Sequence, residues 1–425
     1  MTTNFSFHLY PPINKIDLSG CSDVLEVFSG TSVDSESHFA IYISVPWCHS
    51  QCNSCSYFIS TIKKGSRKLE EYALLLEKQI DSFRGLLSLE DKKCHAIYFG
   101  GGTASLLDAR LISNLIQKIS SAFTLSSNCE ITLEGNPLDF RYYYLEHVRE
   151  TGVNRLSIGL QSLDDGVLKI LNSPHNAGDG INALENALRT NFITINTDLI
   201  YGIPSQSYQS WIDTLEKVVE LHPQSITRFN YIIYPESKIE KLISEGKLPV
   251  KSDDKSIIEL MDYTKNYLEK NNYKSSRYTN ASLHGASQEY GRIVYQENCN
   301  LIGLGVNSYG FVNGYQYHST RNIRKFCDSI SKNNLGWLES ISPPATQRDL
   351  IEKYTISNLY DSFIYYEKFQ KRFSVKFDDV YGDVVNKLIQ NRLLKKKQNY
   401  LQLTNNGIMD KFEVLRHFIN TSYLS

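Results

Sequence analysis

The stretch VPWCHSQCNSC, residues 45–55, places three thiols within eight positions, at Cys48, Cys52 and Cys55. Its first two residues end the run FAIYISVP at residues 39–46, whose aromatic and β-branched residues predict a strand. The other five cysteines of the chain are widely scattered. The sequence therefore predicts a functional site in the loop at the end of this strand.

Around this loop, short β-rich runs alternate with amphipathic stretches. Residues 106–123 predict a helix, because apolar residues recur at spacings of one, three and four. Such alternation predicts an α/β fold with a parallel sheet, either doubly wound or curled into a barrel. Glycine and polar residues follow several strands, where a parallel barrel places its active-site mouth. The six predicted strands are residues 39–46, 94–102, 130–137, 155–162, 192–204 and 225–235.

The pattern changes after about residue 240. Residues 253–271 predict a helix, and residues 301–320 predict a β-hairpin with tight turns at Gly310 and Gly314. The segment SPPATQRD reads as a break before a C-terminal part in which RLLKKKQNYLQLTNNG predicts a helix followed by a β-wing. We expect four units: an N-terminal segment 1–38, a core 39–240, an extension 241–335 and a C-terminal domain 336–425.

Composition narrows the class of protein. The 45 basic and 46 acidic residues give a formal charge of -1, which predicts no binding to nucleic acid or to an anionic membrane surface. We expect a cytoplasmic protein, because the sequence shows neither a leader pattern nor a long apolar run. In a reducing compartment, clustered cysteines favour a metal or redox role over a disulfide. The isolated cysteines are expected in the core: Cys21, Cys94, Cys129, Cys299 and Cys327.

A closed zinc site needs four ligands, and the sequence offers no second CxxC or HxxxH pair. Three thiolates from one loop can instead hold three irons of a 4Fe-4S cluster, which leaves the fourth iron open to a small molecule. The alternatives are a degenerate zinc site completed by His49, or three thiols without a metal.

Together with the ordered motifs YFGGGTAS, EITLEGNP, NRLSIGLQS, TDLIYGIP and LIGLGVNSYG, the CxxxCxxC loop resembles the radical S-adenosylmethionine (SAM) superfamily, and within it the oxygen-independent coproporphyrinogen III oxidase-like family. The resemblance covers about residues 39–315, and RLLKKKQNYLQLTNNG resembles the winged-helix-like element of the family. It implies a partial (β/α)6 barrel, a 4Fe-4S cluster held by Cys48, Cys52 and Cys55, and one or two molecules of SAM. An electron donor such as flavodoxin or ferredoxin is the implied partner.

The same resemblance implies residues that contact SAM. Glycines at a strand end let the backbone approach a ligand closely, and carboxylates or an amide at neighbouring strand ends can bind its polar groups. Arg155 could neutralise a bound carboxylate or pair with an acidic residue at a helix end, and we do not choose between these roles. We assign no catalytic residue. The predicted cofactor-binding residues are Tyr42, Gly100, Gly101, Gly102, Thr103, Glu134, Gln161 and Asp198.

Departures from the family pattern bear on the reaction. Tyr57 stands in place of a fourth cysteine, Ser54 in place of an aromatic residue, Ser173 in place of an arginine and Ile232 in place of an alanine. Since serine cannot imitate a bidentate guanidinium, the second SAM site of the oxidases is reshaped or lost.

Three functions remain open. The leading hypothesis is class C type methyl or methylene transfer to an unsaturated small molecule or a tetrapyrrole. The others are oxidative decarboxylation of coproporphyrinogen III and a haem chaperone without turnover. His175 and His284 are assigned no role, because a lone histidine in a polar loop is usually just solvated.

Overall fold

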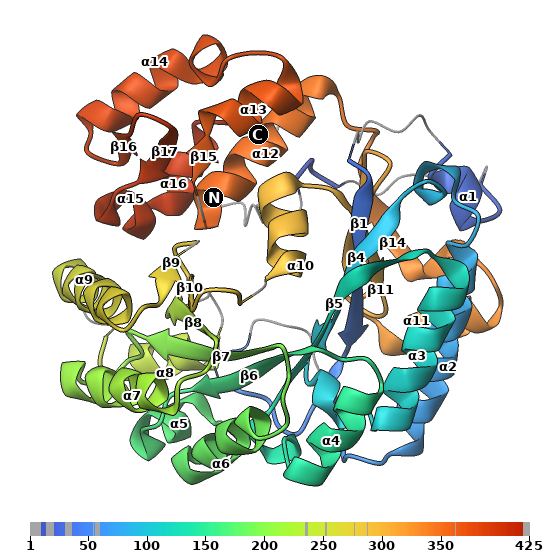
Figure 1. The fold of residues 1–425 in the computed structure, drawn as a ribbon, viewed down its shortest axis with the longest axis horizontal. Coiled ribbons are helices and arrows are strands. Elements are labelled where there is room, and N and C mark those ends of the chain that lie inside the picture. The colour runs from blue at the N-terminus through green and yellow to red at the C-terminus, as the bar shows by residue number, and fades with distance from the viewer. Residues whose placement is uncertain are drawn as a thin grey trace.

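The computed structural model describes residues 10–13, 21–29, 36–53, 55, 60–233, 237–250, 253–275, 277–286, 288–361 and 363–419. Within them, six parallel strands lie side by side in chain order and curl into an open barrel (Figure 1). This confirms the predicted α/β class and the six strands of the core. The strands are β1 (His38–Val45), β4 (Lys93–Gly101), β5 (Leu125–Gly135), β6 (Arg155–Gln161), β7 (Thr194–Tyr201) and β8 (Ser225–Asn230).

Three strands differ in length from the prediction. β7 covers Thr194–Tyr201 rather than residues 192–204. β5 begins at Leu125 because Cys94 of β4 already pairs with this residue, across a register shift. β8 ends at Asn230, where β7 ends opposite it at Tyr201, so no partner strand continues the ladder. Residues 234 and 235, the last two of the predicted strand, lie outside the described residues.

Helices cover the outer face of the barrel (Figure 1). α3 buries Leu111, Ile112, Leu115, Ile116 and Ile119, the face that the apolar spacing predicted. The covering helices between the parallel strands are α2 (Arg67–Ser82), α3 (Ala109–Ala122), α4 (Tyr142–Glu150), α5 (Asp165–Leu171), α6 (Ala177–Leu188) and α7 (Tyr208–Leu221).

The sheet continues on both sides of the six strands. β11 (Asn300–Leu304) pairs parallel with β1, and β12 (Tyr309–Val312), β13 (Tyr315–Ser319) and β14 (Leu338–Ile341) follow antiparallel. On the other side β10 (Asn280–Ser282) pairs with β8, and β9 (Lys274–Ser275) with β10. The remaining elements of this region are α8 (Lys238–Ser244), α9 (Asp254–Lys270), α10 (Glu289–Gly291), the π-helical turn η5 (Arg292–Glu297) and α11 (Ile323–Ser331).

The predicted hairpin is present as β12 and β13, and Gly314 forms its turn with a φ of +86°. The turn predicted at Gly310 is wrong. Gly310 lies inside β12, where a Cβ atom would collide with the ring of Tyr317, so it is needed for close packing. The preceding turn instead uses Gly305, with a φ of +90°.

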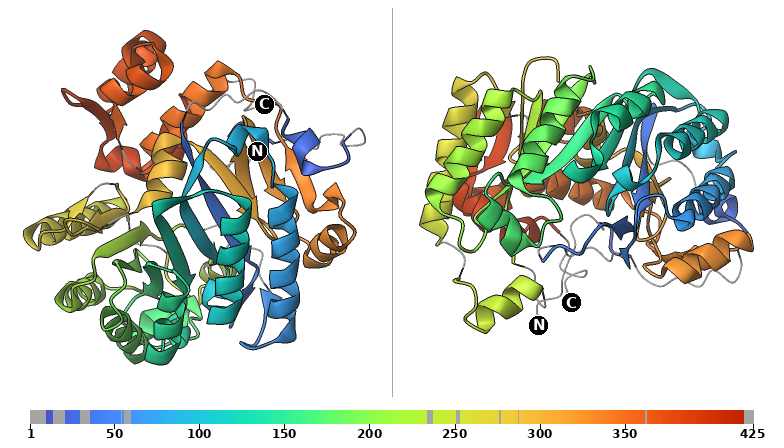
Figure 2. Two further views of the ribbon diagram at one scale, coloured as in Figure 1. Left: turned by 45° about the vertical axis from the view of Figure 1, so that its right-hand side comes forward. Right: turned by 90° about the horizontal axis from the view of Figure 1, so that it is seen from below.

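The C-terminal part packs around its own apolar cluster, which includes Phe369, Phe373 and Phe377. Figure 2 shows these helices beside the barrel, apart from the helices that cover its strands. The helices are α12 (Gln347–Asp361), α13 (Tyr366–Phe373), α14 (Phe377–Gln390), α15 (Asn405–Met409) and α16 (Lys411–Arg416). They accompany a small sheet of β15 (Ile364–Tyr365), β16 (Leu394–Lys396) and β17 (Tyr400–Leu403). The four-unit division remains a prediction. β11 to β14, which fall in the predicted extension and C-terminal units, share one sheet with the strands of the core.

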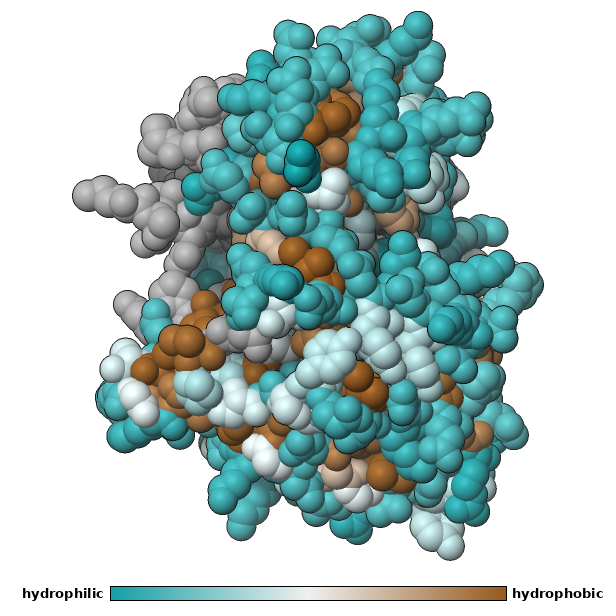
Figure 3. Space-filling view, turned by 90° about the vertical axis from the view of Figure 1, so that its left-hand side faces the viewer, coloured by the Kyte–Doolittle hydropathy of each residue, from teal (hydrophilic) through white to brown (hydrophobic). Residues whose placement is uncertain are grey.

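Among the described helices, none combines the length and the apolar character that crossing a bilayer requires. The face drawn in Figure 3 is largely hydrophilic, with apolar residues in small groups.

Candidate functional site

The cysteine loop leaves the carboxyl end of β1 and is held by backbone contacts on both sides. Cys48 belongs to the short strand β2 (Trp47–Cys48), which pairs with β3 (Ser60–Thr61). Farther along, the Asn53 N–H donates to the Leu171 carbonyl over 2.8 Å, at the end of α5. The Cys55 N–H donates to the Cys52 carbonyl over 3.2 Å, which closes a tight turn between two of the thiols. The loop is thus fixed at its start and at its middle.

The three thiols lie close enough to influence one another. Burial raises the pKa of Cys48 to about 12, a hydrogen bond with Thr103 opposes this, and Cys55 and Cys52 raise the pKa further. Burial, and then Cys55, raises the pKa of Cys52 to about 11. Deprotonating all three thiols would place like charges near one another, and a bound metal would offset these charges and deprotonate the thiols. Three converging sulfurs from one loop fit three irons of a 4Fe-4S cluster.

His49, the candidate fourth zinc ligand, is engaged elsewhere. Its Nε2 lies 2.8 Å from Asp139 Oδ2, and Asp139 is only 4% exposed. The same carboxylate accepts hydrogen bonds from Lys64 Nζ at 2.9 Å and from Ser105 Oγ at 2.8 Å. Although burial alone would raise the pKa of Asp139, the His49 and Lys64 contacts hold it below its usual range. Asp139 therefore ties the cysteine loop to the ends of β4 and β5.

The glycine-rich end of β4 divides into two parts. A Cβ atom on Gly100 would lie 2.9 Å from Glu134 Oε2 and 3.0 Å from the Tyr42 hydroxyl, so this glycine leaves room between two predicted ligand residues. A Cβ atom on Gly102 would instead lie 2.5 Å from the Trp47 carbonyl oxygen. Gly101 has a φ of +103°, which favours glycine. Gly101 and Gly102 thus seat the cysteine loop on the strand end, and Gly100 opens the barrel interior.

The barrel interior holds an unusual set of charges. Burial raises the pKa of Glu134 to about 8, and neighbouring Asp198 raises it further, against the opposing influence of Tyr98 and Arg155. Burial also raises the pKa of Asp198, which accepts hydrogen bonds from Ser157 Oγ at 3.0 Å and Asn196 Nδ2 at 2.9 Å. Two partly buried carboxylates with raised pKa values are poised to receive a positively charged group.

Arg155, which sequence reasoning left open, belongs to this interior set. It is 4% exposed, and its Nε has no hydrogen-bond partner within the described part of the chain. The hydroxyls of Thr132 and Thr197, on β5 and β7, are likewise buried without a partner in that part. Buried polar atoms of this kind usually have a partner, so a polar ligand such as SAM fits the site.

Gln161 is placed differently. It ends β6 with a φ of +57°, and its Nε2 would lie 2.6 Å from a Cβ on Gly159, so the side chain folds back over its own strand. The structure therefore brings Tyr42, Gly100, Glu134 and Asp198 into one interior and sets Thr103 beside Cys48, but it links Gln161 to none of them through a described contact. The roles of all these residues toward SAM stay predictions.

Sequence reasoning missed Asp139 altogether. Its only signal is an acidic residue shortly after a strand end, in NPLDF, and that is a weak one. Of the four departures, Ser54 and Tyr57 lie outside the described residues, whereas Ser173 and Ile232 lie within them. Ser173 Oγ is 2.9 Å from Nδ1 of His175, a buried residue whose Nε2 is 3.2 Å from the Leu160 carbonyl oxygen. Ser173 and His175 thus close a polar contact within one loop.

The isolated cysteines separate into two groups. Cys94, Cys129 and Cys299 are buried, as predicted, whereas Cys21 and Cys327 are only partly buried.

Comparisons with known proteins agree with this geometry. A family model of the radical SAM superfamily matches residues 42–218, and a model of the HemN C-terminal domain matches residues 364–409. The haem chaperone HemW of Lactococcus lactis is 25% identical over 86% of this chain and 93% of its own. The oxygen-independent coproporphyrinogen III oxidase of Escherichia coli is 23% identical over 88% of this chain and 83% of its own.

The solved structure of the Escherichia coli oxidase superimposes with a TM-score of 0.78 at 21% identity, covering 97% of this chain and 96% of that one, which shows a shared fold. These relatives do not support methyl transfer, the leading hypothesis from the sequence. The chain therefore combines a radical SAM domain with a HemN C-terminal domain, is similar to oxygen-independent coproporphyrinogen III oxidase and to the haem chaperone HemW, and has a 4Fe-4S cluster and SAM as its cofactors.

Proposed function

We propose that this protein is a haem chaperone of the HemW type, which binds haem or a closely related tetrapyrrole while its barrel holds the 4Fe-4S cluster and SAM. The haem chaperones support this proposal because this chain covers a larger share of their length than of the oxidase's length. The chain spans 93% of the Lactococcus lactis chaperone and 98% of the Bacillus subtilis chaperone, but 83% of the Escherichia coli oxidase.

The observation that carries the proposal is the surroundings of Ser173. In the oxidases the family position resembling Ser173 holds an arginine at a second SAM site. Here a neutral hydroxyl bonds to His175 within its own loop, so it offers no guanidinium to a ligand carboxylate. Loss of this contact removes a charge-assisted pair, which contributes about 1.5–3 kcal/mol to such binding. Decarboxylation chemistry that depends on a second SAM is therefore disfavoured.

The residues for a first SAM are retained. Cys48, Cys52 and Cys55 would hold the cluster, and Gly100 leaves room for the ligand beside Tyr42. Glu134 and Asp198 would accept hydrogen bonds from an ammonium group and from hydroxyls, and Arg155 would face a carboxylate. When bound, the cluster and SAM together supply a radical that abstracts hydrogen from carbon. The protein positions these groups.

This intact interior favours a second candidate, oxidative decarboxylation of coproporphyrinogen III. A protein that only carries haem has no chemical need for two partly buried carboxylates with raised pKa values near an arginine whose Nε has no hydrogen-bond partner among the described residues. An electron donor of the flavodoxin or ferredoxin type would be needed in this case.

One anaerobic experiment separates the candidates. Reconstituted full-length protein is titrated with haem by difference spectroscopy, and the haem-loaded form is mixed with an apo-haemoprotein acceptor. In parallel, the protein receives SAM, reduced flavodoxin and coproporphyrinogen III. The chaperone proposal expects saturable haem binding, haem transfer and no loss of carbon dioxide from the porphyrinogen.

Protoporphyrinogen as a product would replace the chaperone proposal with the oxidase. S-adenosylhomocysteine formed in proportion to a methylated tetrapyrrole would restore methyl transfer. A variant with Cys48, Cys52 and Cys55 changed to alanine serves as the control, because it removes SAM cleavage while the haem titration reports binding on its own.

A further inference from the structure

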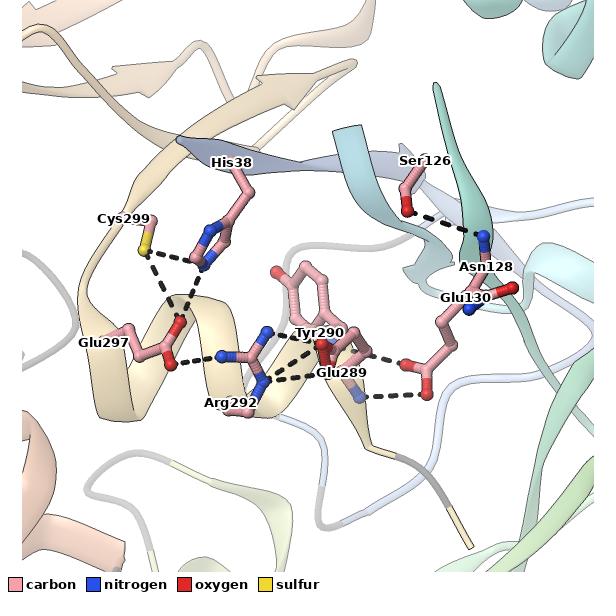
Figure 4. Close-up of polar contacts among 9 residues, drawn as sticks. All are labelled: His38, Ser126, Asn128, Glu130, Glu289, Tyr290, Arg292, Glu297 and Cys299. Atoms are coloured by element: carbon pink, nitrogen blue, oxygen red, sulfur yellow. Dashed lines mark hydrogen bonds and ion pairs between the residues drawn. The ribbon is translucent and has the colours of Figure 1, made fainter. Parts of the chain in front are cut away.

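We propose that His38, Glu297 and Cys299 form a binding site for a divalent transition metal of the zinc class, separate from the cysteine loop. His38 is the first residue of β1, and the cysteine loop follows the last residue of this eight-residue strand. At about 3.3 Å per residue the two places lie roughly 25 Å apart, at opposite ends of the barrel. Figure 4 shows the three side chains converging.

Sheet pairing brings the three residues together. β1 and β11 are parallel neighbours with Phe39 opposite Asn300, so the residues before them, His38 and Cys299, are adjacent across the strands. Glu297 is the last residue of η5, two positions before Cys299. Residues 261 positions apart in sequence therefore contribute to one cluster at the amino ends of two paired strands.

The donor atoms are spaced almost as a tetrahedral ion requires. His38 Nε2, Glu297 Oε2 and Cys299 Sγ all lie within 4.8 Å of one another. Sγ is 3.5 Å from Nε2 and 3.9 Å from Oε2, while Nε2 and Oε2 are hydrogen bonded at 2.7 Å. Zinc bonds of about 2.0–2.3 Å at tetrahedral angles place donor atoms about 3.3–3.6 Å apart. To admit the ion, the histidine and the carboxylate must separate by roughly 0.6 Å, and the thiol and the carboxylate must approach by roughly 0.3 Å.

The identities of the donors also suit zinc. Thiolate, imidazole and carboxylate are the three side-chain ligands that this ion accepts. The site is enclosed, since Cys299 is 2% exposed and the His38 and Glu297 side chains are 12% and 27% exposed. With a neutral imidazole, the thiolate and carboxylate would balance the charge of a divalent ion, and water could supply the fourth ligand.

A second layer of contacts orients the carboxylate. Arg292 Nη1 binds Glu297 Oε1, which leaves Oε2 directed at His38 and Cys299 (Figure 4). Arg292 is itself held by Glu289, with Nε 2.8 Å from Oε2. Glu130 accepts the backbone N–H groups of Glu289 and Tyr290 at 2.9 and 3.1 Å. Fixed outer partners of this kind are typical of metal ligands.

The metal would fasten the segment 289–299 to the barrel. Within this segment, the Tyr290 ring lies 4.8 Å from that of Tyr98 and 6.1 Å from that of Tyr42. Tyr98 and Tyr42 belong to the interior beside Gly100. The ion would therefore hold one wall of the barrel interior in place without taking part in its chemistry.

The test begins with zinc content. Full-length protein with a reconstituted cluster is washed with a weak chelator and analysed by mass spectrometry for metals. We expect one zinc per chain, and its loss in Cys299→Ala. The matched control is Cys94→Ala, another buried cysteine, on the other strand that pairs with β1, which should keep its zinc.

Cobalt then identifies the ligands. In the full-length chain lacking Cys48, Cys52 and Cys55, cobalt should bind with a thiolate-to-metal absorption band of tetrahedral type. His38→Ala and Glu297→Gln should each weaken binding at least about tenfold. Circular dichroism verifies that each variant is folded. The absence of a thiolate band in the parent chain, or its survival in Cys299→Ala, would overturn the proposal and leave a plain hydrogen-bonded cluster.

Discussion

Asp139 offers a sharp test of how the cysteine loop is held. Replacing Asp139 by asparagine keeps the shape of the side chain but removes the charge that Lys64 and His49 face at 2.9 and 2.8 Å. Breaking a buried pair by removing one partner costs about 3–5 kcal/mol. Because the Lys64 side chain is 34% exposed and can regain water, we expect a loss of about 2–3 kcal/mol in the free energy of unfolding.

The assay is equilibrium urea unfolding of the cluster-free protein, followed by circular dichroism. The matched control is Asp108→Asn, an exposed N-cap carboxylate that accepts from the Leu111 N–H, where asparagine is an equally good cap. Adding Lys64→Met to Asp139→Asn should recover about 1 kcal/mol, because no ammonium is then left unpaired. The reasoning fails if Asp139→Asn lies within about 0.5 kcal/mol of the wild type, or if the second change recovers nothing.

Three further changes have expected outcomes. Cys48→Ala should abolish both the visible absorption of the reconstituted cluster and 5'-deoxyadenosine formation, measured by spectroscopy and chromatography. Gly100→Ala should destabilise the protein by about 1–3 kcal/mol and weaken SAM binding, because its Cβ would lie 2.8 Å from the Tyr98 ring. Gly382→Ala, in α14 with open space around it, should stabilise by about 0.5–1 kcal/mol in the same urea assay.

Finally, burial lowers the pKa of Lys353 from 10.5 to about 7, so unfolding becomes harder as pH rises from about 7 to 10.5. In the wild type the free energy of unfolding should rise by up to about 1.4 kcal/mol per pH unit over this range, and Lys353→Met should remove that rise. A pH profile of urea unfolding that is the same in both proteins would contradict this prediction.

The sequence predicted the core of the fold well because its signals are local. The apolar spacing within α3 and the β-branched runs of the six strands each depend on residues a few positions apart. The cysteine loop was equally visible, since Cys48, Cys52 and Cys55 are neighbours in sequence.

The contacts that sequence could not supply are long-range. Asp139 meets His49 across 90 positions, and no local pattern marks either of them as a partner of the other. The role of Arg155 stayed open because only the packed structure shows that its Nε is buried without a hydrogen-bond partner among the described residues. Gly310 was assigned to a turn because glycine is common in turns. In the structure a glycine is required there because the ring of Tyr317, on the next strand, leaves no room for a Cβ atom.

The place of β1 between β4 and β11 has a consequence for synthesis on the ribosome. One edge of β1 can pair as soon as residues 93–101 emerge, but the other must wait for residues 300–304. An unpaired edge readily joins a strand of another chain. For most of translation the nascent protein therefore exposes an aggregation-prone border, and we expect chains truncated before residue 300 to be insoluble where the full-length protein is not.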